Sequence, residues 1–359
     1  MGIRVLIMAG GTGGHVFPAL AVAERLRAEG AEVSWMGTRR GLEARVVPEH
    51  GLPIDWVEVG GLRGKGLGRW LSAPVHLLRA LAQAWGIMSR RRPDVVLGMG
   101  GFVTGPGGVA ARLLRRPLLI HEQNRIPGLT NRLLKPLAAR VMCGFPDTFP
   151  ESDKIVVTGN PVREKLAEIP PPQERLAGRT GRPRLLVVGG SLGAAFFNET
   201  VPAALARLPE ATRPHVHHQC GERHLAAAQA AYAEAGVEAE IFPFIEDMAA
   251  AYRWADLVLC RAGALTVAEL AVAGAAAVLV PYPYAVDDHQ TANARYLADE
   301  GAAVLVQQRD LDEARLAEVL GALLSDRGRM LEMASRARAL GRPEATREVA
   351  DLCLVNAHV

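Results

Sequence analysis

The sequence is poor in cysteine and has no long apolar segment. Its four cysteines are far apart and none belongs to a C-x-x-C pair. This argues against a zinc site or a disulfide framework and favours a reducing compartment. The longest apolar run, residues 270–280, is too short to span a membrane, and the N-terminus lacks a signal-peptide pattern. We therefore expect a cytoplasmic protein that does not cross a membrane.

Two common nucleotide-binding patterns are also missing. In the dinucleotide fingerprint G-x-G-x-x-G, the third glycine is replaced by Val16 when counted from Gly11, and by Val103 when counted from Gly98. A P-loop ends in Gly-Lys-Ser or Gly-Lys-Thr, but Gly105 is followed by proline and glycine. The sequence therefore disfavours NAD binding and NTPase chemistry.

The length of 359 residues predicts two domains, and the charge is unevenly distributed between them. Residues 1–160 carry 21 Lys and Arg against 12 Asp and Glu, whereas residues 161–359 carry 20 against 26. The first half therefore prefers an anionic partner or surface.

Apolar strand-like runs alternate with amphipathic helical patterns along the whole chain. This alternation predicts an α/β fold with parallel sheets that are covered by helices on both faces. The expected strands lie at residues 3–8, 33–36, 95–98, 118–121, 141–143, 155–158, 185–188, 216–218, 257–260, 277–280 and 303–306.

A repeat suggests how the chain is divided. A basic residue, four apolar residues and a glycine-rich turn occur from Arg4 and again from Arg184. We infer two doubly wound domains, 1–160 and 161–340, with a ligand cleft between them. The last helical pattern is broken near Gly341-Arg342-Pro343, and the segment 341–359 is a candidate to return to the N-terminal domain.

The first glycine-rich turn is Gly-Gly-Thr-Gly-Gly-His at residues 10–15. Its glycines let backbone N–H groups approach a ligand, and the helix that follows adds a partial positive charge. We expect an anion there, most simply a phosphate, with His15 beside it. The alternative is a tight strand-to-helix turn with a surface histidine.

Three further motifs of the first half are candidates for ligand contacts. Residues 98–108 form a second glycine-rich turn. His-Glu-Gln-Asn at 121–124 ends a strand, and its polar side chains either face a cleft or form an exposed turn. Arg163 follows Asn-Pro-Val and suits bidentate phosphate contacts, although a solvent-exposed arginine would look the same.

The second half contains a phosphate-type turn, Gly-Gly-Ser-Leu-Gly at 189–193, and a helix that is expected to begin near Leu265. The free N–H groups of that helix can bind a pyrophosphate. Glu269, one turn later, can accept two hydrogen bonds from a ribose diol. The alternative is an acid stabilised by the helix dipole.

Taken together, these motifs resemble the MurG family, the bacterial undecaprenyl-diphospho-muramoylpentapeptide N-acetylglucosaminyltransferases. The resemblance runs from Arg4 to about residue 350 and includes Gly-Leu-Arg-Gly-Lys-Gly at 61–66, Ala-Leu-Thr-Val-Ala-Glu at 264–269 and Asp-His-Gln at 288–290. It implies a GT-B fold of two Rossmann-like domains and no cofactor. It further implies inverting transfer of GlcNAc from UDP-GlcNAc to the 4-hydroxyl of the MurNAc unit of lipid I, which gives lipid II.

The resemblance also implies site residues. Donor contacts would fall on Thr12, Gly13, Gly14, Asn124, Arg163, Ser191, Ile245, Ala264, Leu265, Thr266, Val267, Ala268, Glu269, His289 and Gln290, with Ile245 meeting the uracil through its backbone. Acceptor contacts would fall on Gly13, Gly14, Gly101, Gly105 and Gly107. Two positions depart from the family: Leu192 stands where Gln is frequent, and His289 replaces the first residue of a Gln-Gln pair.

The leaving diphosphate needs preorganised donors or a metal. One D-x-D sequence, Asp310-Leu311-Asp312, occurs, and we interpret it as a helix start with Asp310 as N-cap and Glu313 at the capping-box position. We therefore predict no metal. The helix start at Leu265, the Ser191 turn and Arg163 would take its place.

A hydroxyl acceptor benefits from a general base, which contributes roughly 10²–10⁴-fold. His15 is the candidate, because a neutral imidazole is available near neutral pH. The alternative is that His15 only binds the acceptor pyrophosphate or orients the hydroxyl.

Residues 59–93 contain no acid and combine basic with apolar residues. The basic residues are Arg63, Lys65, Arg69, Arg79, Arg90, Arg91 and Arg92, and the apolar ones are Trp70, Leu71, Val75, Leu77, Leu78, Leu81, Trp85, Ile87 and Met88. This pattern is typical of a helix lying on an anionic bilayer. Nucleic acid is disfavoured because no binding module is present. An amphipathic helix packed on its own sheet is the other alternative.

We therefore expect a peripheral enzyme at the cytoplasmic face of the cell membrane, with other cell-wall synthesis proteins as further candidate partners. Two rival functions remain: a UDP-GlcNAc 2-epimerase of GT-B fold, which needs no lipid acceptor, and a non-catalytic UDP-sugar-binding membrane subunit, which would not require His15.

Overall fold

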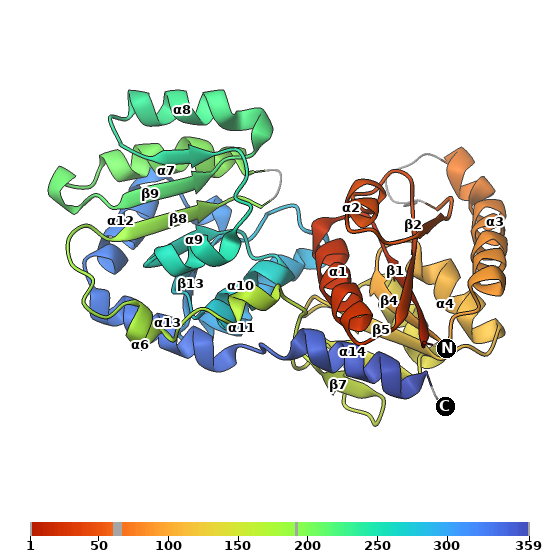
Figure 1. The fold of residues 1–359 in the computed structure, drawn as a ribbon. Helices are drawn as coiled ribbons and strands as arrows, with labels where there is room; N and C mark the ends of the chain where they lie inside the picture. The colour runs from red at the N-terminus through yellow and green to blue at the C-terminus, as the bar shows by residue number, and fades with distance from the viewer. Residues whose placement is uncertain (1, 60–66, 191–192, 358–359) are drawn as a thin grey trace. The chain divides into compact units, whose positions relative to one another are not determined.

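The computed structural model describes residues 2–59, 67–190 and 193–357, with the side chains of 67–73 left out. The chain divides into two compact units, the first formed by Met1–Arg163 with Glu344–Val359 and the second by Glu164–Pro343. Each unit is an α/β body built on a parallel sheet (Figure 1). The motif at 61–66, Ser191 and Leu192 lie outside the described residues.

The sheet of the first unit has the strand order β3-β2-β1-β4-β5-β6-β7, and all its pairs are parallel. The strands are β1 (Arg4–Ala9), β2 (Glu32–Gly37), β3 (Ile54–Trp56), β4 (Val95–Gly100), β5 (Leu118–Glu122), β6 (Arg140–Cys143) and β7 (Ile155–Val157). Successive side chains of a strand face opposite sides, so the continuous apolar run of β1 sends Val5 and Ile7 to one face and Leu6 and Met8 to the other.

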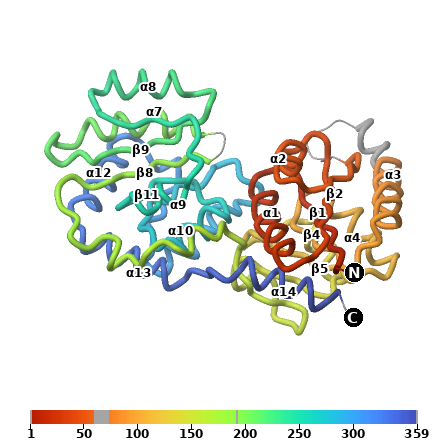
Figure 2. Tube along the Cα trace, viewed as in Figure 1, coloured from red at the N-terminus to blue at the C-terminus, as the bar shows by residue number. Residues whose placement is uncertain are grey.

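Helices cover both faces of this sheet. Residues of α1, α2 and α14 pack on the face of Val5, and residues of α3, α4 and α5 on the face of Leu6. The last helix, α14, lies beside α1 (Figure 2). The bounds are α1 (Gly13–Ala28), α2 (Glu43–Glu49), α3 (Leu67–Arg91), α4 (Thr104–Leu113), α5 (Leu129–Leu134) and α14 (Ala345–Asn356), with a 3₁₀ turn η1 (Lys135–Leu137).

The sheet of the second unit has the order β10-β9-β8-β11-β12-β13 and is also parallel. One face packs against α7, α8, α12 and α13, with Phe197 and Tyr232 among the buried residues. The strands are β8 (Arg184–Val188), β9 (His215–Gln219), β10 (Glu240–Phe242), β11 (Leu257–Cys260), β12 (Ala277–Leu279) and β13 (Ala303–Leu305). The helices are α6 (Pro172–Arg175), α7 (Ala195–Ala206), α8 (Leu225–Glu234), α9 (Met248–Trp254), α10 (Ala264–Ala273), α11 (His289–Ala298), α12 (Glu313–Leu324) and α13 (Arg327–Leu340). The 3₁₀ turns are η2 (Glu164–Leu166), η3 (Glu210–Thr212), η4 (Glu222–His224), η5 (Val286–Asp288) and η6 (Gln308–Asp310).

The expected strands and the helix break before residue 345 are confirmed, and two points differ. The short edge strands β3 and β10 were not expected, because each has three residues, includes an acid and is only partly buried. The expectation that Asp310 is an N-cap is wrong. Asp312 caps α12, where its side chain accepts the Arg315 N–H at 2.7 Å.

The strand order reverses once in each sheet. In the first unit this switch lies between β1 and β4, and in the second between β8 and β11. Open α/β sheets bind ligands at the carboxyl ends of the strands beside such a switch. Each of these four strands is followed by a glycine-containing turn, so these four turns are the candidate ligand-binding loops.

At the opposite end of β1, Asp94 holds Arg4. Its carboxylate accepts hydrogen bonds from the Arg4 backbone N–H at 2.9 Å and from the Arg4 guanidinium at 2.8 Å, and the hydrogen bond from the guanidinium lowers the pKa of Asp94.

Asp94→Asn is expected to lower the Tm of the first unit by about 2–4 °C at pH 7. Because the folded pKa lies below the unfolded value of about 4, the stabilisation is complete above pH 4 and is lost as the pH falls through the folded pKa. Melting curves of both proteins between pH 7 and pH 3 should therefore converge in acid, and a constant difference would contradict the assignment.

Candidate functional site

The two glycine-rich turns of the first unit pack directly against each other. Gly101 has φ +86°, and a Cβ at this position would collide with the carbonyl oxygen of Gly10. A side chain at residue 101 is therefore excluded both by backbone conformation and by space. The contact joins the end of β1 to the end of β4, at the switch point of the sheet.

His15 lies at the junction of these turns. It is the third residue of α1, half-buried, and its ring covers Gly100: a Cβ there would lie 2.5 Å from Cδ2 and 2.8 Å from Nε2. Thr12 is the N-cap of the same helix. The amides of Gly13 and Gly14 are in the first turn, where a helix offers them no acceptor. The structure thus brings an imidazole and helix-start donors together.

Two glycines that are predicted to contact the sugar acceptor, Gly105 and Gly107, lie within α4 and not in the turn before it. Gly107 is buried, and the Met8 sulfur occupies the space that a Cβ would need. Close packing of helix on sheet accounts for the glycine at this position. Gly105 lies nearer the helix start and is half-buried, with Thr130 at 3.8 Å from a built Cβ.

The strand end at residues 121–124 is mostly interior. His121, Glu122 and Gln123 are 0%, 3% and 2% exposed, so the exposed-turn alternative is wrong for them. His121 Nε2 lies 2.9 Å from the Gly159 carbonyl oxygen, and burial lowers the pKa of His121 to about 4. This histidine is therefore neutral at physiological pH and braces the loop after β7.

Glu122 positions the one residue of that stretch that remains accessible. Its Oε1 accepts the Asn124 backbone N–H at 3.0 Å, and its Oε2 accepts from the Gly128 N–H at 3.0 Å and from Asn131 Nδ2 at 2.9 Å. Sequence reasoning missed Asn131, because it lies within a helical pattern that carries no motif. Asn124 is half-buried and is held by this carboxylate.

Arg163 is the last residue of the first segment of the unit. Its guanidinium lies 5.8 Å from the ring centroid of Phe17 on α1. A cation over an aromatic face is partly immobilised, which distinguishes Arg163 from a freely moving surface arginine. The contact places a positive charge beside the start of α1.

In the second unit, α10 begins directly after β11. Gly263 is its N-cap in an extended conformation, and the first hydrogen bond of the helix runs from the Val267 N–H to the Gly263 carbonyl. The amides of Ala264, Leu265 and Thr266 therefore lack intrahelical acceptors, an arrangement that in proteins generally suits an anion. The Val267 side chain is fully buried, so its contribution is to packing.

Glu269 lies in the second turn of α10 and is 7% exposed. Its Oε2 accepts a hydrogen bond from the Tyr252 hydroxyl of α9 at 3.1 Å. Tyr252, which sequence reasoning missed, thus orients the carboxylate that is expected to bind a ribose. No spacing in the sequence links the two residues.

Gln290 ties the loop after β12 to the start of α10. Its Oε1 accepts the Ala262 N–H at 3.2 Å and the Tyr282 N–H at 2.9 Å. His289 Nδ1 lies 2.7 Å from the Val286 carbonyl oxygen. The pair at 289–290 therefore shapes this loop, whichever ligand contacts it makes.

Gln219 performs a similar role at the end of β9. It donates through Nε2 to the Gly190 carbonyl at 2.9 Å and accepts the Ile245 N–H at 3.0 Å. The Ile245 N–H is therefore already engaged by Gln219. Gln219 was not anticipated, since a glutamine at a strand end is a weak signal.

Arg261 is the residue that follows β11. Its guanidinium donates to the carbonyls of Val280 and Pro281 and to Gln308 Oε1, and it lies 4.7 Å from the Phe197 ring centroid. Burial lowers the pKa of Arg261, and the group remains cationic. A fixed positive charge thus lies three residues before Ala264, the first residue of α10.

Two kinds of feature are absent from residues 2–59, 67–190 and 193–357. No group of three or more His, Cys, Asp or Glu side chains in those ranges is arranged to hold a metal ion. No helix in the same ranges has both the length and the apolar character needed to cross a bilayer.

Comparison with known proteins identifies the family. The glycosyltransferase family 28 N-terminal domain matches residues 5–143, and the family 28 C-terminal domain matches residues 184–350. Two relatives, from Nitrosococcus oceani and Alkalilimnicola ehrlichii, are each 60% identical to this chain over 99% of its length. The alignments cover 99% and 100% of the relatives, respectively, and both are named UDP-N-acetylglucosamine--N-acetylmuramyl-(pentapeptide) pyrophosphoryl-undecaprenol N-acetylglucosamine transferase. The crystal structure of Acinetobacter baumannii MurG is 45% identical and matches with a TM-score of 0.87, covering 98% of this chain and 99% of that one. The fold is therefore GT-B, and the chain belongs to glycosyltransferase family 28 and, within it, to the MurG family.

Proposed function

We propose that this chain transfers GlcNAc from UDP-GlcNAc to MurNAc-pentapeptide pyrophosphoryl-undecaprenol, lipid I, and so forms lipid II. The observation that carries the proposal is 60% identity over almost the full length of transferases with that activity in their names. The structure supports it with a separate set of hydrogen-bonded polar groups near the switch point of each sheet.

The donor is assigned to the second unit. The free amides at the start of α10 would bind the diphosphate, and Glu269, oriented by Tyr252, would bind the ribose. As the bond from the anomeric carbon to the diphosphate breaks, negative charge grows on the leaving group. Preorganised helix-start donors and the cation of Arg261 act where this charge develops, so we propose transfer without a metal.

The acceptor is assigned to the first unit. His15 would take the proton of the 4-hydroxyl while that oxygen attacks the anomeric carbon opposite UDP, which inverts the configuration. The imidazole is held by the packing of two turns, a precondition for accurate proton transfer.

The two rival functions are not favoured. UDP-GlcNAc 2-epimerases of Listeria monocytogenes and Neisseria meningitidis share the architecture, with TM-scores of 0.67 and 0.66, but only 14% identity, which shows the fold alone. A non-catalytic subunit would have no use for an imidazole enclosed between two glycine-rich turns.

The first test is transfer of labelled GlcNAc from UDP-GlcNAc to a lipid I analogue in the presence of EDTA. The wild type should form lipid-linked disaccharide, and His15→Ala should lower kcat by at least ~10² with UDP-GlcNAc binding unchanged. Absence of transfer by folded wild type that binds UDP-GlcNAc would refute the transferase assignment. Near-normal turnover by His15→Ala would show that His15 is not the base and would leave the transferase assignment standing. Loss of wild-type activity in EDTA would contradict only the metal-free mechanism.

A second test concerns the ribose contact. Glu269→Ala should weaken UDP binding, measured by calorimetry, by at least ~10-fold, because hydrogen bonds to a charged group contribute about 1.5–3 kcal/mol each. Tyr252→Phe keeps the carboxylate and removes only its orienting hydroxyl, so a smaller loss is expected. Equal affinity of wild type and Glu269→Ala would exclude this contact.

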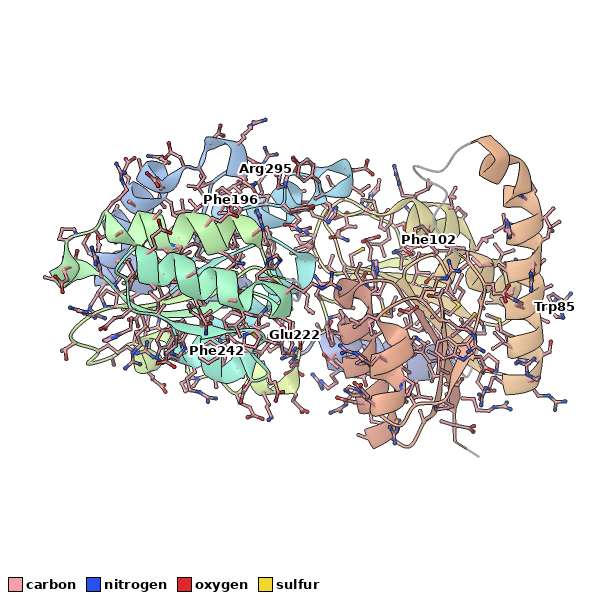
Figure 3. The ribbon with its side chains drawn as sticks, turned by 90° about the horizontal axis from the view of Figure 1, so that it is seen from above. Trp85, Phe102, Phe196, Glu222, Phe242 and Arg295 are labelled. Atoms are coloured by element: carbon pink, nitrogen blue, oxygen red, sulfur yellow. The ribbon has the colours of Figure 1, made fainter. Side chains whose placement is uncertain are left out.

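We further propose that the first unit binds an anionic membrane surface. The α3 side chains Ala84 and Ile87 pack in the core, whereas Val75, Leu78 and Trp85 are 66%, 67% and 43% exposed, and Trp85 projects outward (Figure 3). The packed-helix alternative therefore accounts for one face of α3 only.

Neighbouring helices extend the apolar surface. Leu113 of α4 and Leu129 and Leu133 of α5 are exposed, beside the exposed Arg112 and Arg132. Sequence reasoning missed them because they lie outside residues 59–93.

The positive charge of residues 59–93 is smaller than a count of basic residues suggests. Arg79 pairs with Glu58 at 3.0 Å, and Arg90 and Arg91 pair with Asp55 at 3.5 and 2.7 Å. Apolar contact must therefore supply a substantial share of the proposed binding.

Leu78→Glu is expected to weaken binding to phosphatidylglycerol vesicles by about 10-fold, since it removes the burial of a leucine side chain. Val355→Glu is the matched control: Val355 is 66% exposed but lies on α14. In sedimentation with vesicles, less Leu78→Glu than Val355→Glu should be bound. In detergent, both variants should transfer GlcNAc to a short-chain acceptor at the same rate. Equal sedimentation of both variants would contradict a membrane role for α3.

A further inference from the structure

A fully buried acid lies beneath the first glycine-rich turn. Glu43, the first residue of α2, is 0% exposed. Its Oε2 accepts the Gly11 N–H at 2.9 Å, and its Oε1 accepts the Thr38 N–H at 2.9 Å and the Thr38 hydroxyl at 2.7 Å. Among the described residues, no cation forms an ion pair with it. Three donors from two loops therefore satisfy this carboxylate.

The chain makes room for this side chain with glycines. A Cβ at Gly10 would lie 2.5 Å from Glu43 Oε1, one at Gly37 would lie 2.8 Å from Cγ, and one at Gly41 would collide with Oε2. The first turn, the end of β2 and the loop before α2 thus close around one carboxylate. Burying a carboxylate is costly unless hydrogen bonds satisfy it, and here three donors from two loops do so.

The carboxylate also determines which amides of the turn face outward. The Gly11 N–H points inward to Glu43, so it is not available to an external anion, and a negative charge lies behind it. A phosphate at this turn, which the sequence predicts, would therefore not reach the Gly11 N–H. The amides at the start of α1 remain as candidate ligand donors.

We propose that Glu43 is a positioning residue of the transfer reaction: by holding Gly11 it fixes the first turn, and with it His15, against Gly100 and Gly101. The proposal rests on the proposed function, in which His15 accepts the proton. The chain of contacts is continuous, because Glu43 bonds Gly11, the neighbouring Gly10 carbonyl meets Gly101, and the His15 ring covers Gly100.

Glu43→Gln is the first test. Glutamine keeps the size but places an amide NH₂ opposite either the Gly11 or the Thr38 N–H, so at least one donor loses its acceptor. We expect kcat to fall about 10-fold or more, since small displacements of a catalytic group are costly, while the KM for UDP-GlcNAc changes less than about twofold. Amide hydrogen exchange should rise in peptides that cover residues 9–16.

Asp94→Asn is the matched control. It also removes a carboxylate that binds the backbone of β1, but at the opposite end of that strand. It should lower Tm while leaving kcat and the exchange of residues 9–16 unchanged. The proposal is overturned if Glu43→Gln behaves like this control, or if it raises the KM for UDP-GlcNAc and leaves kcat unchanged.

Gly41→Ala provides a second variant in case Glu43→Gln does not fold. Its added Cβ displaces Oε2, the atom that binds Gly11, and leaves the charge in place. It should also raise exchange at residues 9–16 and lower kcat, and unchanged values of both would overturn the proposal. If the wild type shows no transfer at all, the proposed function fails, and the exchange measurements alone decide whether Glu43 holds the turn.

Discussion

The candidate site of the first unit depends on one contact, the packing of the Gly10 carbonyl against Gly101. The contact requires a glycine at residue 101, and it forms because β1 and β4 are neighbours at the point where the strand order reverses. Beside this contact the His15 ring covers Gly100. A side chain at residue 101 would collide with Gly10, and one at residue 100 would collide with the His15 ring.

Buried and half-buried polar side chains hold the loops of both units in place by accepting backbone N–H groups. Glu43 in the first unit and Gln219 and Gln290 in the second each accept an N–H group from a loop more than 20 residues away in sequence. Glu122 accepts from the loop that directly follows its own strand. Loops at the ends of strands have no ladder to satisfy their amides, so a buried acceptor both satisfies them and selects one conformation. The amides at the starts of α1 and α10 lack intrahelical acceptors and are candidate ligand donors.

The two units differ in the charge that they place at these starts. In the second unit the guanidinium of Arg261 precedes the start of α10, which suits a leaving diphosphate. In the first unit the Glu43 carboxylate binds the buried side of the first turn, and the His15 imidazole lies over Gly100 at its end. This arrangement suits proton removal from a neutral hydroxyl. This division of chemistry matches the transfer of a sugar from a nucleotide to an alcohol.

The fold, the family and most of the strands follow from local pattern, because apolar runs and glycine-rich turns report backbone conformation directly. His15 and the start of α10 could be named for the same reason. The sequence could not reveal that His121 and Gln123 are interior, that Asp312 rather than Asp310 caps α12, or that Glu43, Tyr252 and Gln219 support the site. Apart from the Asp312 cap, which is a local contact with Arg315, these roles arise from contacts between residues that are distant in sequence, and only the tertiary structure decides which side chain meets which partner.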